Sequence, residues 1–391
     1  MADRSFDVVV VGGGVMGCAA AWHLARDGRR VALVEQFAVG HGRGSSHGPS
    51  RIIRLSYEGA DYVQLARAAF ELWRELEAVS GAALMRKVGG LDFGPSDAMG
   101  LDGMRATMRA AGVPFEQLDG AEIMRRYPQF CLPADTVGFY QGDYSMLNAG
   151  ACVAAMAGEA RKHGAHFFEG EPVQQIVTHP GHVELRTASD TFRVERVILS
   201  AGSWMGPLLR QLGLDLPLTV KKEQVAFFLP PDPAMFMPDR FPLFIQRFPG
   251  TTSLGTAFPM FGSDGVKAML DRTGPEVESS DDDRTIDAAG IDRLRAYVAG
   301  ILPALGDKLG EAVSCRYTLT PDEDFIIDHH PAHPEIIIAS PCSGHGFKFG
   351  AVIGRILADL AERGATQYPI DRFRIDRPAL KHPSGQTVAS R

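Results

Sequence analysis

Residues 6–35 read FDVVVVGGGVMGCAAAWHLARDGRRVALVE. The continuous β-branched run Val8–Val11 is typical of a strand that is buried on both faces. Three glycines at the spacing G-x-G-x-x-G follow it, and residues 19–25 then predict a helix. A second apolar strand over 31–34 ends at Glu35. Strand, glycines, helix, strand and acid stand in the order of a dinucleotide-binding βαβ unit.

Each glycine of this motif has a separate physical role. Gly12 permits a tight turn, Gly14 lets a pyrophosphate approach the backbone, and Gly17 lets the helix pack closely on the strand. Val15 and Met16 lie between these glycines, near a helix N-terminus that offers free N–H groups and a positive dipole end to phosphates. We therefore expect this turn to bind the nucleotide.

Glu35 stands where a carboxylate accepts both ribose hydroxyls and repels a 2′-phosphate. The motif is therefore compatible with FAD or with NAD, and its position at the start of the sequence favours a resident FAD. An ordinary βαβ unit that uses its glycines for packing alone is the alternative interpretation.

The overall composition excludes several classes of protein. A chain of 391 residues is long enough for a substantial core and two domains, and 45% hydrophobic with 22% charged residues is ordinary for a globular protein. A net charge of −7 disfavours nucleic acid as a partner, and no apolar run is long enough to cross a membrane. Five scattered cysteines argue against a disulfide framework. We expect no metal site, and a cytoplasmic location because no signal-peptide pattern precedes the first strand.

A glycine- and serine-rich stretch, residues 40–54, follows the second strand. It contains His47, Arg51 and Arg54, so that two arginines stand three residues apart. A solvated surface loop is one interpretation of this composition. Cationic groups concentrated beside a nucleotide-binding unit favour the other interpretation, contact with an anion or a flavin.

The remaining sequence predicts a second domain inserted into the first. Helices are expected over 61–79, 98–111, 122–127, 149–163, 286–301 and 351–363, and strands over 88–93, 165–168, 173–178, 183–187, 192–194, from 196, and over 225–229, 243–247, 253–258 and 335–340. We assign residues 1–86, 147–222 and 325–391 to the dinucleotide-binding domain. Residues 87–146 and 223–324 then form a substrate domain, whose antiparallel strands are expected to wall a cavity.

Two further features lie near the C-terminal end. A glycine-rich turn over 341–350, PCSGHGFKFG, opens a helix and can stabilise negative charge on a reduced flavin ring. Lys348 in this turn is either a surface lysine or a group that holds a substrate carboxylate. Cys315 stands between apolar residues and a predicted strand, where a cysteine is ordinarily a packing residue.

Together these motifs resemble those of the monomeric sarcosine oxidase family, FAD-dependent amine oxidoreductases of the D-amino-acid oxidase superfamily. The resemblance extends nearly from end to end and rests on the first glycine motif, Ser45–Arg54, Cys315–Thr318, Phe325–Asp328 and Ser343–Phe349. It implies an α/β fold in which an FAD-binding Rossmann-like domain is interrupted by a substrate domain with a mixed or antiparallel sheet. Members of this family oxidise secondary amines, and its relatives act on N-methyltryptophan and on glycated amino acids.

The resemblance also implies roles for individual residues. Cys315 would carry FAD through a thioether to the flavin 8α-methyl group. Arg54 and Lys348 would pair with the substrate carboxylate, with Arg51 close to the flavin. Lys267, which the local pattern alone places in a loop, would stabilise the negative charge that forms when O₂ accepts an electron.

The complete set of expected site residues is larger. The expected catalytic residues are His47, Arg51, Arg54, Lys267, Tyr317 and Lys348, and the expected cofactor-binding residues are Gly12, Gly14, Val15, Met16, Gly17, Glu35, Ser45, Ser50, Arg51, Cys315, Gly344, Gly346, Phe347 and Lys348. Arg316 either helps to lower the pKa of the neighbouring Cys315 thiol or points away from it. Thr256 and Asp271 replace a tyrosine and a histidine of sarcosine oxidase, which puts sarcosine itself in doubt as the substrate. Asp271 either attracts a cationic substrate group or pairs with Arg272 and faces water.

We therefore expect an FAD-dependent oxidase of secondary amino acids, N-alkyl or cyclic. Its product would be an imine that hydrolyses to an aldehyde and an amine, with H₂O₂ as the second product. One alternative is an FAD-dependent amine dehydrogenase that passes electrons to a protein partner, and another is a flavin-binding protein without catalysis. The expected partners are a small amine or amino-acid substrate and O₂, with no nucleic acid and no membrane, and the expected state is a monomer or a small homo-oligomer.

Overall fold

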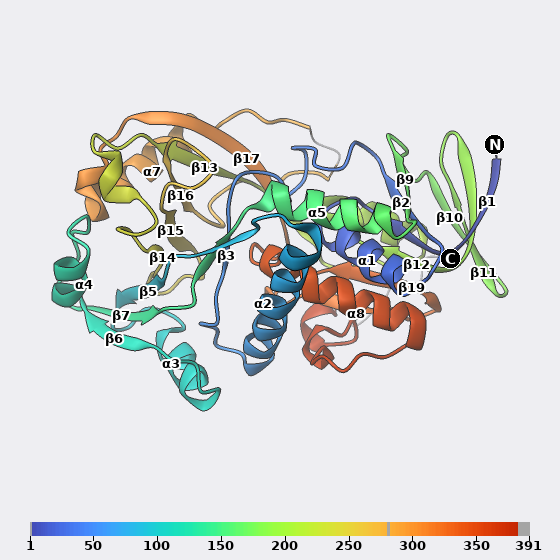
Figure 1. Ribbon diagram of the computed structural model, residues 1–391, viewed down its shortest axis with the longest axis horizontal. Coiled ribbons are helices and arrows are strands. Elements are labelled where there is room, and N and C mark those ends of the chain that lie inside the picture. The colour runs from blue at the N-terminus through green and yellow to red at the C-terminus, as the bar shows by residue number, and fades with distance from the viewer. Residues whose placement is uncertain (1, 280–281, 382–391) are drawn as a thin grey trace.

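The computed structural model describes residues 2–279 and 282–381, which form two eight-stranded sheets and one three-stranded sheet. Figure 1 shows the two large sheets in opposite halves of the molecule, with helix α2 (Ala60–Ser80) between them. The chain therefore has the mixed α/β architecture that the sequence predicts, with a Rossmann-like unit in one half.

The first large sheet surrounds the strand that precedes the glycine motif. Its strands are β1 (Ala2–Val11), β2 (Val31–Glu35), β9 (His166–Glu169), β10 (Gln175–His179), β11 (His182–Arg186), β12 (Asp190–Leu199), β18 (Ile326–His330) and β19 (His333–Ser340). β1 lies in the centre and pairs in parallel with β2 and β12. Val8 and Val10 pack into one hydrophobic core, and Val9 and Val11 pack into another. The strand is thus buried on both faces, as its β-branched run predicts.

β12 is one continuous strand, whereas the sequence predicts two shorter ones. Its first half pairs with β11 in an antiparallel meander, its second half pairs in parallel with β19, and β1 follows its length on the other side. Glu195 and Arg196 are both exposed at its middle. Two polar residues in succession interrupt the alternating pattern of the strand, and this explains the predicted break.

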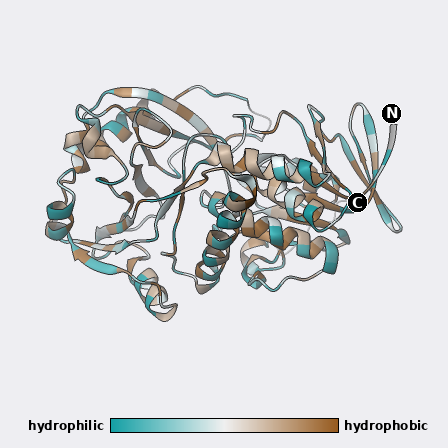
Figure 2. Ribbon diagram, in the orientation of Figure 1, coloured by the Kyte–Doolittle hydropathy of each residue, from teal (hydrophilic) through white to brown (hydrophobic). Residues whose placement is uncertain are grey.

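Helices α1 (Val15–Arg26), α5 (Ala149–Lys162) and α8 (Gly350–Arg363) cover one face of this sheet. α1 begins at Val15, four residues before the predicted start, and it packs between α5 and α8. The approach to α8 is very close: a Cβ atom on Gly354 would lie 2.4 Å from the Cβ atom of Ala19 and 2.5 Å from its carbonyl carbon. In Figure 2, α2 carries hydrophilic and hydrophobic segments side by side, as expected of a helix with one buried face.

The second large sheet contains β5 (Gly90–Pro95), β6 (Glu116–Asp119), β7 (Thr136–Gln141), β13 (Thr219–Phe228), β14 (Leu243–Arg247), β15 (Leu254–Phe258), β16 (Val266–Leu270) and β17 (Leu309–Leu319). Its neighbouring strands are antiparallel except for the parallel pair β5 and β14, so the sheet is mixed. A phenylalanine-rich core, which includes Phe93, Phe130 and Phe244, covers the face of this sheet that lies away from the first sheet.

The other elements connect and cover the two halves. They are the small sheet of β3 (Arg51–Ile53), β4 (Met85–Lys87) and β8 (Ser145–Leu147), the helices α3 (Leu101–Ala110), α4 (Gly120–Arg126), α6 (Met205–Gln211) and α7 (Ala288–Ile301), and short 3₁₀ helices at Gly202–Trp204, Pro233–Phe236, Pro303–Leu305, Phe347–Phe349, Asp371–Phe373 and Pro378–Leu380. The domain boundaries stay a prediction.

In the part of the chain that the structure describes, no helix has the length and apolar character needed to cross a bilayer.

The contact between α1 and α8 generates a stability prediction. We expect Gly354→Ala to lower the free energy of unfolding by about 1–3 kcal/mol, because the added methyl group overlaps the backbone of α1. The matched control is Gly158→Ala in α5, where no neighbouring element of the described chain lies within 4 Å of the new methyl group. The free energy of unfolding of that variant should rise by up to about 1 kcal/mol, because alanine has a better helix propensity than glycine. Urea unfolding followed by circular dichroism measures both, and equal stability of the two variants would contradict the close contact.

Candidate active site

A cavity of about 670 Å³ opens between the two large sheets. Its wall combines the turn after β1, Glu35, residues 44–54, the inner face of the second sheet and the turn before α8. The expected site residues line this cavity, with the exceptions of Gly17 and Ser50. Segments that are far apart in the sequence therefore meet at one place.

The turn after β1 has the conformation that its glycines predict. Gly12 has a φ of 105° and its N–H donates to the Val34 carbonyl at 2.9 Å. A Cβ atom on Gly17 would lie 1.8 Å from the Gly12 carbonyl oxygen, so Gly17 serves the packing of α1 and not the cavity wall. The Val15 N–H donates to Ser46 Oγ at 3.1 Å. The first turn of α1 lacks acidic residues, which leaves the N-terminus of this helix favourable to an anion.

Glu35 is fixed at the end of β2 by the backbone around it. Its Oε2 atom accepts from the Gly13 N–H at 2.6 Å, and its Oε1 atom accepts from the Phe37 N–H at 2.8 Å. The residue is buried and lines the cavity. Each carboxylate oxygen has a further lone pair, so Glu35 can still accept from ribose hydroxyls.

Residues 44–54 contribute to the cavity wall, which favours contact with an anion or a flavin, although Gly42 and Arg43 earlier in the same stretch are exposed. The Arg51 guanidinium ties the stretch together by donating to several of its carbonyl groups. The acceptors, 2.7–2.9 Å away, belong to Ser45, His47 and Ser50. Burial, with a further contribution from Arg51, lowers the pKa of His47 to about 4, so its imidazole is neutral at pH 7.

Arg54 is held by a buried hydrogen-bond network that the sequence analysis missed. Arg54 donates to Ser56 Oγ at 3.0 Å, and Ser56 in turn donates to Asp92 at 2.6 Å. The Tyr144 hydroxyl also donates to Asp92, which is fully buried. Burial opposes the charge of Arg54, but Tyr144 and Asp92 more than compensate and raise its pKa. One feature of the sequence could have indicated this network: Asp92 is a carboxylate inside the otherwise apolar segment that forms β5.

Lys348 is 3% exposed, so its interpretation as a surface lysine is wrong. Its Nζ atom donates to the His345 carbonyl at 2.7 Å. The ring centroid of Tyr57 lies 5.7 Å from this Nζ atom and 4.2 Å from Cζ of Arg54, so the two cations approach the same ring. Burial, together with the charge of Arg54, holds the pKa of Lys348 well below its usual value.

The turn that presents Lys348 needs its glycines. Ser343 and Gly344 have φ values of 47° and 79°. A Cβ atom on Gly346 would lie 1.6 Å from the Pro341 carbonyl oxygen. The Phe347 ring faces the guanidinium of Arg51, with 5.5 Å from its centroid to the Cζ atom. This turn therefore joins the cationic loop at the cavity wall.

Lys267 is the second residue of β16, and its placement in a loop by the local pattern is wrong. The side chain is 6% exposed, and its Nζ atom donates to the Ser50 carbonyl at 3.0 Å. The Phe258 ring centroid lies 4.6 Å from the same atom. Burial, followed by the charge of Arg51, lowers the pKa of Lys267 well below its usual value. Ser50 thus supports the cavity through its carbonyl group, although it does not line it.

Cys315 and Tyr317 project from β17 into the cavity wall. Burial raises the pKa of the Cys315 thiol, and the charges of Arg51 and Lys267 oppose that shift. The Arg316 guanidinium donates to the Ser279 carbonyl at 2.7 Å. The cations that favour the thiolate include Arg51 and Lys267, from distant parts of the chain, and a contribution of Arg316 stays a prediction.

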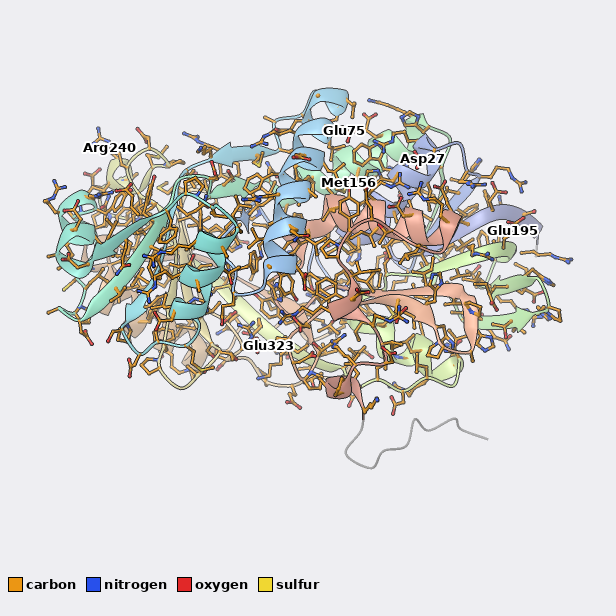
Figure 3. All side chains as sticks on the ribbon, turned by 90° about the horizontal axis from the view of Figure 1, so that it is seen from below. Asp27, Glu75, Met156, Glu195, Arg240 and Glu323 are labelled. Carbon is orange, nitrogen blue, oxygen red and sulfur yellow. The ribbon has the colours of Figure 1, made fainter. Side chains whose placement is uncertain are left out.

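Thr256 and Asp271 both line the cavity. Asp271 pairs with Arg272 at 2.7 Å, as one of the two interpretations expects, but it is buried and does not face water. Burial raises the pKa of Asp271 to about 6. Arg272 also pairs with Glu323 at 2.9 Å, and Figure 3 shows Glu323 between the two halves of the molecule. This ion-pair network therefore lies where the two halves meet.

The residues present fit FAD. The N-terminus of α1 and Glu35 suit a pyrophosphate and a ribose, and the buried cations lie in another part of the same wall. Several polar atoms of the wall are buried without a hydrogen-bond partner among the described residues, namely Arg54 Nε, His47 Nε2 and Thr256 Oγ1. Such atoms are costly unless a ligand or water satisfies them.

Comparisons with known proteins point in the same direction. A family profile described as FAD dependent oxidoreductase matches residues 7–360. Monomeric sarcosine oxidase of Bacillus sp. (strain B-0618) is 35% identical over 98% of this chain and 99% of its own. N-methyl-L-tryptophan oxidase of Salmonella arizonae is 30% identical over 95% of this chain and 99% of its own.

Among solved structures, the chain resembles NikD, described as an unusual amino acid oxidase essential for nikkomycin biosynthesis. The TM-score is 0.85 at 29% sequence identity, and the match covers 95% of this chain and 97% of NikD. Profile, sequences and fold agree over nearly the whole chain. This protein therefore belongs to the FAD-dependent oxidoreductases and, within them, to the family of sarcosine and N-methyl amino acid oxidases.

Proposed function

We propose that this chain is an FAD-dependent oxidase of secondary amino acids, N-alkyl or cyclic, that yields an imine and H₂O₂. The imine then hydrolyses to an aldehyde and an amine. The observation that carries this proposal is the pair of buried cations Arg54 and Lys348, which approach one tyrosine ring in the cavity wall. The names of the relatives, sarcosine oxidase and N-methyl-L-tryptophan oxidase, support a substrate that carries both an amine and a carboxylate.

FAD, when bound, supplies the removal of two electrons from the amine and their transfer to O₂. The chain holds the cofactor and positions the substrate. The N-terminus of α1 and Glu35 are suited to the nucleotide part. Cys315, Arg51 and the turn before α8 are suited to the flavin part, because cations and a helix N-terminus favour negative charge on a reduced ring.

Arg54 and Lys348 are suited to bind the substrate carboxylate. Charge-assisted hydrogen bonds are strong in a site that excludes water, and both side chains are almost completely buried. The low pKa of Lys348 reflects burial and the neighbouring Arg54. A bound carboxylate would reverse that shift, because it adds an opposite charge beside both cations.

Thr256 and Asp271 support a substrate larger than sarcosine. A threonine fills less of the cavity than the tyrosine that it replaces. Its hydroxyl is buried and has no partner among the described residues, so it can bond to a polar substituent. Asp271 and Arg272 add a paired acid and base to the same wall.

Oxidation of an amine library in the absence of O₂ tests the proposal directly. Loss of the yellow absorbance with secondary amino acids, followed by stoichiometric H₂O₂ after O₂ is admitted, is the expected result. Full reduction with little H₂O₂ and fast reduction of an artificial dye would favour the dehydrogenase alternative. If no amine reduces the flavin, the remaining alternative is a flavin-binding protein without catalysis.

The carboxylate pair generates a binding prediction. Lys348→Met should weaken the binding of substrates that carry a free carboxylate by about tenfold to a hundredfold, since a lost charge-assisted contact is worth roughly 1.5–3 kcal/mol. Their decarboxylated analogues should bind as before. Lys87→Met, at an exposed lysine paired with Asp143, is the control and should change neither. The test is the dissociation constant of each compound, measured by titration of the flavin absorbance. Equal losses of affinity for both compound classes would show that the carboxylate binds elsewhere.

Lys267 generates a prediction that separates the two halves of the reaction. Transfer of an electron to O₂ creates negative charge that a fixed ammonium stabilises, whereas oxidation of the amine does not require it. We expect Lys267→Met to leave the anaerobic loss of absorbance nearly unchanged. The return of the flavin absorbance after mixing with O₂ should slow by a factor on the order of 10²–10³. Stopped-flow absorbance measures both steps, and unchanged reoxidation would exclude this role for Lys267.

Cys315 generates a prediction about the cofactor bond. Its place in the cavity wall and the charges of Arg51 and Lys267 support a thioether to FAD. After acid precipitation the yellow colour should stay with the protein, and the tryptic peptide that contains Cys315 should carry the mass of the flavin. Cys315→Ser should release FAD into the supernatant, whereas Cys131→Ser, at an exposed thiol, should not. Release of FAD from the unchanged protein would mean that the cofactor is bound reversibly.

A further inference from the structure

Glu223 is a fully buried acid beside Cys315 to which none of the steps above assigns a role. It lies on β13, directly opposite Cys315 on β17. Residues that face each other in an antiparallel pair project from the same face of the sheet, with Cβ atoms about 4.5–5.5 Å apart. The carboxyl group and the thiol are therefore neighbours, although 92 positions in the numbering separate them.

The carboxyl group of Glu223 is incompletely bonded. Its Oε1 atom accepts from the Gly274 N–H at 3.2 Å, and the Thr273 backbone also favours its charged form, but its Oε2 atom has no partner at regular hydrogen-bond geometry among the described residues. The segment after β16 presses against β13 here, since a Cβ atom on Gly274 would lie 1.9 Å from the Lys222 carbonyl oxygen. Water is thus kept from a carboxyl oxygen that lacks a partner. Such an arrangement costs folding free energy, and it points to a functional role.

The charged groups around the two side chains favour transfer of a proton between them. Asp271, on the segment after β16, adds a like charge near Glu223, and Lys221 on β13 adds an opposite one. Burial raises the pKa of Glu223 to about 7, so the group can accept a proton near neutral pH. On the thiol side, Arg51 and Lys267 favour the thiolate, whereas the charge of Glu223 disfavours it, so the carboxylate and the thiolate compete for one proton.

We propose that Glu223 is the base that accepts the thiol proton of Cys315 when the thioether to FAD forms. This inference rests on the covalent attachment proposed above. In that reaction the S–H bond of Cys315 and one C–H bond of the 8α-methyl group break, and one S–C bond forms. The two electrons released pass through the flavin ring to O₂, which takes up two protons and becomes H₂O₂. One thiol, one methyl group and one O₂ thus give one thioether and one H₂O₂.

The position of Glu223 separates this role from substrate oxidation. Glu223 does not line the cavity, whereas Cys315 does. The acid therefore lies beside the thiol on the same face of the sheet but does not border the space where the substrate and the cofactor would bind. Loss of its charge should change how FAD becomes attached and not whether FAD binds.

The test compares the full chain with Glu223→Gln, which keeps an acceptor for the Gly274 N–H. Each protein is produced under riboflavin limitation and mixed with FAD and O₂ at several pH values. The fraction of flavin that stays in the acid pellet is followed with time, and mass spectrometry of the Cys315 peptide confirms the bond. The total amount of FAD that each protein binds before precipitation shows whether that protein is folded. Glu311→Gln, at an exposed acid of β17, the strand that carries Cys315, is the control.

For the unchanged protein, attachment should accelerate as the pH rises through about 7, where Glu223 loses its proton. Glu223→Gln should bind FAD, but attachment near pH 7 should slow by a factor on the order of 10² or more. Its pH profile should move upward, because the buried thiol must then ionise without a base. Glu311→Gln should match the unchanged protein.

A second variant keeps the inference testable if Glu223→Gln does not fold. Asp271→Asn removes a like charge near Glu223 and should move the profile to lower pH. Attachment by Glu223→Gln at the original rate and with the original profile would overturn the role of Glu223 alone. In a Glu223→Gln protein that does not fold, an unshifted Asp271→Asn profile would do the same. Complete release of FAD from the unchanged protein would instead overturn the proposed thioether, and this inference with it.

Discussion

The burial of positive charge in the cavity wall is the constraint on which the rest of the structure depends. Arg54, Lys267 and Lys348 are buried and Arg51 is half-buried beside them, in a wall where an unpaired charge is costly. The fold offsets this cost with backbone carbonyl groups and aromatic rings, as at Lys267, which donates to the Ser50 carbonyl and lies over the ring of Phe258. These cations come from β3, β16 and their neighbours, and from the turn before α8. Neither large sheet can therefore assemble the wall alone.

The sequence predicts the nucleotide-binding unit well because its physical causes are local. The turn at Gly12, the burial of β1 and the acid at Glu35 all lie within one βαβ unit, and each has a short-range signature. Lys267 was harder, because a lysine inside a short apolar segment contradicts the pattern of a buried strand. The support of Arg54 by Asp92 could not be predicted from spacing, since tertiary folding alone brings the two together. The cytoplasmic location and the oligomeric state stay predictions.

The surroundings of Cys315 show why neighbours in sequence are an unreliable guide inside a sheet. Successive side chains of a strand leave on opposite faces, so the electrostatic partners of Cys315 have to be sought on other strands as well as next to it in the sequence. Side chains on adjacent strands, in register, are the true neighbours, and Glu223 holds that position. The resemblance to a family identifies the cysteine, but the pairing of strands identifies what surrounds it.

The position of β1 in the centre of the first sheet has a consequence for how the protein is made. β1 can pair early with β2, but its other neighbour is β12, which in turn pairs with β19, so one edge of β1 waits for strands that begin near residues 190 and 333. Contacts of such long range are slow to form, and an unpaired hydrophobic strand is prone to aggregate while it waits. The nucleotide-binding turn at Gly12 acquires the opposite wall of its cavity only after residue 348 has been synthesised. The complete cavity therefore exists only after the chain has been made beyond residue 348, and the open edge of β1 has to stay protected until then.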